Sequence, residues 1–119
     1  MSLSLYGIKS CDTVKKARAW LDGQGVAYAF HDYKALGVDE AMLRRWCAGL
    51  GWEKVINRAG TTFRGLPDTD KQDLTEVKAI RLMHGATSLI KRPILEGEGV
   101  LLAGFSPGVY EAALRSARG

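Results

Sequence analysis

The chain has 119 residues, a length that fits one domain with a single hydrophobic core. Hydrophobic residues make up 46% and charged residues 25%, which excludes disordered, collagen-like and low-complexity proteins. No apolar run approaches the roughly 18 residues of a membrane-spanning helix, and the N-terminus shows no signal-peptide pattern. The formal net charge is +4, and the basic residues are spread among acidic ones rather than gathered into a stripe, so the charge does not indicate nucleic-acid binding. We therefore expect neither a membrane nor a nucleic-acid partner. Because two cysteines do not make a disulfide framework, we also expect a cytoplasmic protein.

The first third of the chain predicts a βαβ unit. Residues 3–8 have the apolar pattern of a buried strand, and residues 11–24 have the apolar spacing of a helix that ends at glycines. Ser10 precedes this helix and is its predicted N-cap. A second strand is predicted over residues 26–32. A strand, a helix and a strand in this order imply a parallel pair of strands.

The middle of the chain is predicted to be helical. A helix over 38–50 is followed by a helical turn over 53–57, a loop over 58–67, and a helix over 74–84 with Val77 on its buried side. The buried face of the first of these helices is predicted from Met42, Leu43, Trp46, Cys47 and Leu50.

The last third returns to strands. We predict a strand over 86–90 and then a hairpin of 94–96 and 100–103 around a Gly-Glu-Gly turn. Ser106-Pro107 starts a final helix. The inward residues of this helix are predicted to be Val109, Tyr110, Ala113, Leu114 and Ala117. The order βαβ, helices, ββα is that of an α/β thioredoxin-like domain, here spanning 1–119 with a helical insertion at about 38–88.

Cys11 stands at the junction of the first strand and the first helix. A cysteine there lies near free backbone N–H groups and the positive end of the helix dipole, which favour the nucleophilic thiolate. Lys9 adds positive charge, whereas Asp12 adds charge that opposes the thiolate. The position alone equally allows a small apolar residue packed at the end of a strand.

Arg92-Pro93 precedes the hairpin, and two interpretations of the proline are open. A cis bond would form a loop that faces Cys11 and leaves a backbone edge free for a peptide-like ligand. A trans proline would instead only end the preceding segment at Ile90.

Three segments in this order resemble the ArsC/Spx superfamily, and most closely its YffB-like branch. They are residues 6–17, 57–64 and 90–95, and residues 31–34 and 104–106 extend the likeness to nearly the whole chain. The resemblance implies a thioredoxin-like fold with a helical insertion and a cysteine nucleophile that uses glutathione as co-substrate. It carries the nucleophile onto Cys11, and the arginine and cis-proline of the family onto Arg92 and Pro93.

Two departures from the family pattern restrict how a disulfide on Cys11 can be resolved and which substrate is expected. Spx regulators usually carry a second cysteine where this chain has Val14, so an internal Cys-x-x-Cys switch is absent. A mixed disulfide on Cys11 must then be resolved by an external thiol, for which the resemblance implies glutathione. Arsenate reductases use further arginines near the positions of Asn57 and Gly104, and their absence argues against arsenate as the physiological substrate.

We expect Cys11 and Arg92 to be catalytic and no metal to bind. His31 and His84 lack neighbouring ligands at a metal-binding spacing, and Cys47 is predicted to be a buried structural thiol. Arginine and lysine side chains would neutralise the carboxylates of glutathione or a substrate oxyanion. The candidate glutathione- or substrate-binding residues are Lys9, Ser10, Asp12, Thr13, Asn57, Arg58, Arg64 and Pro93.

Two functions from different classes remain open at this point. The first is an arsenate reductase-like enzyme, a glutathione-dependent reductase that acts on a small oxyanion or a disulfide. The second is an Spx-like regulator that binds a protein partner such as RNA polymerase.

Overall fold

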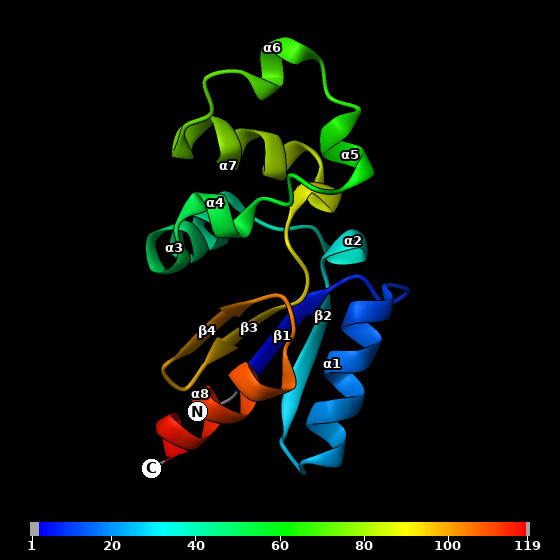
Figure 1. Cartoon of the computed structure of the whole chain (residues 1–119), viewed down its shortest axis with the longest axis vertical. Coiled ribbons are helices and arrows are strands. Elements are labelled where there is room, and N and C mark those ends of the chain that lie inside the picture. The colour runs from blue at the N-terminus through cyan, green and yellow to red at the C-terminus, as the bar shows by residue number, and fades with distance from the viewer. Residues whose placement is uncertain (1–2, 119) are drawn as a thin grey trace. The chain divides into compact units, whose positions relative to one another are not determined.

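A computed structural model describes residues 3–118 of the chain (Figure 1). The chain forms two compact units. The first comprises the residues up to Leu36 together with those from Arg92 onward, and the second is Gly37–Lys91. The second unit coincides closely with the predicted helical insertion at about 38–88. That the two units act as one domain stays a prediction.

The first unit is a four-stranded mixed sheet with helices, which confirms the predicted α/β, thioredoxin-like fold. The strand order is β2-β1-β3-β4; β1 and β2 are parallel, whereas β1 with β3 and β3 with β4 are antiparallel. The βαβ unit and the hairpin are therefore confirmed. The elements are β1 (Leu3–Gly7), α1 (Asp12–Gly23), β2 (Tyr28–Asp32), α2 (Tyr33–Leu36), β3 (Ile94–Gly97), β4 (Val100–Ala103) and α8 (Pro107–Arg118).

The core of this unit lies between α1, α8 and one face of the sheet (Figure 1). Leu5 and Leu95 are register partners on β1 and β3, so their side chains share that face. Tyr110 of α8 packs edge-on against the rings of Trp20 and Phe105. The prediction that Val109 points inward is wrong, because its side chain is 52% exposed. Ala117 lies outside the residues whose side chains are described.

The end of β1 lies in close contact with the first turn of α1. A Cβ atom on Gly7 would lie 2.7 Å from Cγ2 of Val14, so only glycine lets the first turn of α1 sit this close to the strand. The predicted N-cap at Ser10 is wrong by one residue. Cys11 itself occupies the N-cap position, with φ −76° and ψ 129°.

The second unit is helical, as predicted, and α3 packs against α7 in it (Figure 1). The strand predicted over 86–90 is wrong: only Ile90 pairs, in an isolated bridge with Ile56. The predicted burial of Val77 is also wrong, because it is 68% exposed. The elements are α3 (Glu40–Leu50), α4 (Trp52–Val55), α5 (Thr61–Arg64), α6 (Asp68–Lys71), α7 (Glu76–Gly85) and the 3₁₀ helix η1 (Thr87–Leu89). Within residues 3–118, no helix combines the length and the apolar character needed to cross a membrane.

Candidate active site

The topology of the first unit brings three chain segments to one edge of its sheet. Gly7 at the end of β1 pairs with Asp32 at the end of the parallel strand β2, so the chain leaves both strands at this edge. Cys11 follows β1, and Tyr33 follows β2. Because β3 runs antiparallel to β1, with Ile94 opposite Tyr6, it begins at the same edge, where Arg92 precedes it. The sheet therefore positions a thiol, a phenol and a guanidinium together.

The start of α1 holds Cys11 through its backbone. The N–H of Cys11 donates to the carbonyl of Ile8 at 3.0 Å, and its own carbonyl accepts from the N–H of Lys15 at 3.0 Å. These bonds leave the N–H groups of Val14 and Thr13, in the first turn, free to donate to the sulfur. The half-buried sulfur thus has the anion-binding surroundings of a helix N-terminus.

The electrostatics of the site favour the thiolate. Burial raises the pKa of Cys11, but hydrogen bonds from the N–H of Val14, from Arg92 and from the N–H of Thr13 outweigh it. The net pKa of Cys11 lies below its usual range. Among nearby cations Arg92, rather than Lys9, acts most on the sulfur. Cys11 is therefore placed to act as a nucleophile.

Arg92 binds two groups at once. Its guanidinium is hydrogen-bonded to the sulfur of Cys11 and to the hydroxyl of Tyr33. Burial lowers the pKa of Arg92, but the interactions with Cys11 and Tyr33 raise it above its usual value. Arg92 is therefore a permanent cation at the thiolate.

Tyr33 is the member of this site that sequence reasoning missed. Its side chain is buried, and burial, opposed only in part by Arg92, raises the pKa of Tyr33 to about 12. Tyr33 lies within the 31–34 segment that carries part of the family resemblance, but the residue type alone suggested no role. The usable signal is positional, since Tyr33 follows a strand predicted to run parallel to the one before Cys11.

The Arg92–Pro93 peptide bond is cis, as in the first interpretation of this proline, and a free backbone edge for a peptide-like ligand stays a prediction. Pro93 is buried, and its carbonyl accepts the N–H of Gly104 at 2.8 Å. The proposed binding residues Lys9, Ser10, Asp12 and Thr13 are exposed around the start of α1. Of these four, Thr13 contacts Cys11 through its backbone N–H. Their binding of glutathione stays a prediction.

Asn57, Arg58 and Arg64 belong to the second unit. The side-chain oxygen of Asn57 accepts the N–H of Ala59 at 3.3 Å, which shapes the loop after α4. The exposed guanidinium of Arg58 lies over the ring of Trp52 at 5.6 Å, and Arg64 is exposed at the end of α5. Their predicted role toward glutathione stays a prediction.

Cys47 differs from Cys11 in its burial and in the direction in which its pKa is shifted. It is buried in α3, and burial together with the charge of Glu76 raises the pKa of Cys47 to about 11. This confirms its predicted burial as a thiol of the core. Among the described residues, no group of three or more His, Cys, Asp or Glu side chains is arranged to hold a metal ion.

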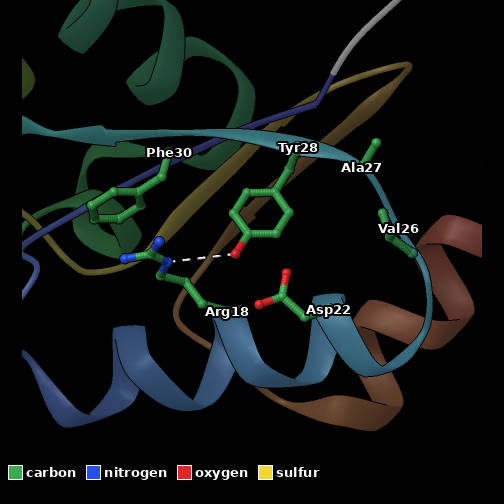
Figure 2. Close-up of a pocket in the computed structure, with 6 residues that line it drawn as sticks. All are labelled: Arg18, Asp22, Val26, Ala27, Tyr28 and Phe30. Carbon is green, nitrogen blue, oxygen red and sulfur yellow. Dashed lines mark hydrogen bonds between the residues drawn. The ribbon is translucent and has the colours of Figure 1, made fainter.

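A separate cavity of about 380 Å³ lies between α1 and β2 (Figure 2). Arg18 crosses it: its Nε–H donates to the hydroxyl of Tyr28 at 3.4 Å, and its Cζ lies 4.3 Å from the centre of the Phe30 ring. The predicted site residues do not line this cavity. Arg18 covers the aromatic side chains at the outer edge of the sheet.

The sequence profile of the ArsC family matches residues 6–113, a span that includes Cys11 and Arg92. The chain belongs to the ArsC family. This confirms the family expected from the sequence.

Two solved structures are similar to this ArsC-family protein. A protein named YffB is 61% identical, with a TM-score of 0.91, over 95% of this chain and 99% of that one. An arsenate reductase (ArsC) related protein from Brucella melitensis is 48% identical, with a TM-score of 0.76, over 97% of this chain and 96% of that one. Both likenesses cover nearly the whole ArsC-family chain.

A curated relative comes from the regulatory branch. The global transcriptional regulator Spx of Streptococcus mutans is 29% identical over 114 residues, covering 94% of this chain and 82% of Spx. The family around this chain therefore contains proteins named as arsenate reductase-related and proteins named as transcriptional regulators.

Proposed function

We propose that this chain is a glutathione-dependent thiol–disulfide oxidoreductase with Cys11 as its nucleophile. The observation that carries the proposal is the place of Cys11 at the N-terminus of α1, where the N–H of Val14, Arg92 and the N–H of Thr13 together lower the pKa of its thiol. Such a site stabilises a thiolate, the form that attacks disulfides. The names of the arsenate reductase-related neighbours add support for redox chemistry.

The proposed reaction has two exchange steps. The Cys11 thiolate attacks the glutathione sulfur of a mixed disulfide; a new S–S bond forms on Cys11, and the other half leaves as a thiolate that takes up a proton. A second glutathione, as thiolate, then attacks the sulfur of the bound glutathione. Oxidised glutathione leaves with the new S–S bond, and the Cys11 thiolate is regenerated. Two electrons pass from glutathione to the substrate.

The chain's own residues would serve this reaction in distinct ways. Arg92 would stabilise the negative charge of the Cys11 sulfur before this sulfur attacks the disulfide. It would stabilise the same charge again when the sulfur leaves as a thiolate in the second step. The exposed Lys9 is the proposed partner for a carboxylate of glutathione. Reduced glutathione is abundant in the cytoplasm, the compartment expected from the cysteine content.

Arsenate reduction is the less favoured form of this chemistry. One of the additional arginines used by arsenate reductases would fall near Gly104. The backbone of Gly104 has φ +85°, a conformation that an arginine adopts only at a cost. The proposed substrate is therefore a disulfide rather than an oxyanion.

Intact-protein mass after exposure to oxidised glutathione tests the proposal. The natural chain and a Cys47→Ala variant should each gain one glutathione adduct, and a Cys11→Ser variant should gain none. Added reduced glutathione should then remove the adduct. An adduct that survives the Cys11→Ser substitution, or no adduct in the natural chain, would overturn the proposal.

An Spx-like binding function is the second candidate, favoured by the similarity to Spx over 94% of the chain. In that case the fold would act as a scaffold that docks on a partner such as RNA polymerase. Purified RNA polymerase mixed with the chain would then form a complex that Cys11→Ser leaves intact. The enzyme proposal predicts that the same substitution abolishes glutathione-dependent turnover.

A further inference from the structure

Arg92 bridges two hydrogen-bond acceptors, of which only one changes its charge during the proposed reaction. A guanidinium carries donors only, so both the sulfur of Cys11 and the hydroxyl oxygen of Tyr33 accept from it. The sulfur loses its charge whenever it forms a disulfide. The oxygen of Tyr33 does not change during the reaction.

Tyr33 is fixed by the fold in a way that Arg92 is not. Its side chain is 1% exposed, and it directly follows Asp32, the residue of β2 that pairs with Gly7 of β1. Arg92, by contrast, is only half-buried and has a long side chain whose ordering costs conformational entropy. The fixed hydroxyl of Tyr33 is therefore placed to order the flexible guanidinium of Arg92.

We propose that Tyr33 is a positioning residue, which holds the guanidinium of Arg92 against Cys11 throughout the reaction, including the stage at which the sulfur is in a disulfide. The proposal rests on the proposed function, because that function assigns Arg92 its role at the reacting sulfur. With Tyr33 in place, Arg92 stays ready to receive the negative charge that returns to Cys11 when glutathione resolves the disulfide. Without Tyr33, the Arg92 side chain would lose its order while Cys11 is in a disulfide, and it would have to be ordered again in each cycle.

The neutrality of Tyr33 suits this role. Burial raises the pKa of Tyr33 to about 12, so the phenol stays protonated across the range in which thiols react. An uncharged acceptor orients Arg92 without neutralising it. The full positive charge remains available to the thiolate.

The test compares Tyr33→Phe with Tyr110→Phe. Tyr110 is equally buried, and its hydroxyl donates to the carbonyl of Gly104 at 2.8 Å, so each substitution removes one hydroxyl that is hydrogen-bonded. The readout is the rate of Cys11 alkylation by iodoacetamide against pH, in a Cys47→Ala background. Tyr33→Phe should slow alkylation at pH 7 by about three- to tenfold, as expected for one hydrogen bond, and shift the profile to higher pH. Tyr110→Phe should leave the profile unchanged.

A second comparison separates positioning from general loosening of the fold. In an Arg92→Gln background, Tyr33→Phe should cause no further loss of alkylation rate, because Tyr33 acts through Arg92. An unchanged profile for Tyr33→Phe, or an equal loss with and without Arg92, would overturn the proposal. Alkylation needs no glutathione, so a failure of the proposed function, seen as an absent glutathione adduct, is distinguishable from a failure of this inference.

Discussion

Replacing Arg92 by glutamine removes a side-chain cation that contacts the Cys11 sulfur. Glutamine keeps a polar group of similar reach but carries no charge. The N–H groups of Val14 and Thr13 still favour the thiolate, because they belong to the backbone of α1. We expect a weakened nucleophile rather than an inert one.

The size of the effect follows from the kind of bond that is lost. A hydrogen bond to a charged group contributes about 1.5–3 kcal/mol net. The lower end applies here, because Cys11 and Arg92 are only half-buried and solvent screens their interaction. About 1.4 kcal/mol corresponds to a tenfold change in the thiolate population. Alkylation at pH 7 should therefore be about ten times slower in Arg92→Gln.

The assay is the pH dependence of iodoacetamide alkylation, followed by mass on the Cys47→Ala background. At a pH high enough to ionise both proteins fully, the rates of Arg92→Gln and its parent should converge. Arg18→Gln is the matched control, because Arg18 is also a half-buried arginine of the first unit, but it contacts Tyr28 and Phe30 instead. An equal loss in Arg18→Gln, or parental reactivity in Arg92→Gln, would refute the assignment of Arg92 to the thiolate.

Three further predictions follow from the same site. Val14→Cys places a thiol three residues after Cys11, so the glutathione adduct should give way to an internal disulfide, two mass units below the reduced protein; a stable adduct would contradict this. Gly7→Ala forces a Cβ to within 2.7 Å of Val14 and should cost about 1–3 kcal/mol in urea unfolding, and added Val14→Ala should restore most of it. Because the folded state lowers the pKa of Cys11, the thiolate contributes stability above its unfolded pKa of about 8.5 that is lost as pH falls through the folded value. The unfolding free energy of the parent minus that of Cys11→Ser should therefore grow as pH rises toward about 8.5, and a constant difference would count against the lowered pKa.

The parts of the fold that are coded locally could be predicted from the sequence. The βαβ unit follows from apolar periodicity between glycine-rich turns, and the hairpin follows from its Gly-Glu-Gly turn, whose three residues all have positive φ. Cys11 could be identified for the same reason, since a strand-to-helix junction is visible in the sequence. The resemblance to the ArsC family supplied Arg92, which lies far from Cys11 along the chain.

The wrong predictions of burial and of a strand concern features that depend on tertiary packing. Val77 and Val109 are apolar and lie in helices, but the side chains on neighbouring elements leave them on the surface. Residues 86–90 have the composition of a strand, but only Ile90 finds a pairing partner, so η1 forms instead. Tyr33 gained its role from the pairing of Gly7 with Asp32, a register that local pattern does not reveal.

The origin of the thiolate's stabilisation bears on the position that Val14 occupies, three residues after Cys11. Among the interactions that lower the pKa of Cys11, the largest is the hydrogen bond from the backbone N–H of Val14. A backbone donor is present whatever side chain position 14 carries. A cysteine in place of Val14 would therefore leave this stabilisation of Cys11 intact. The exchange changes only what resolves the disulfide, an external thiol or an internal one, so Val14→Cys should move this chain from one mode to the other while Cys11 keeps its reactivity.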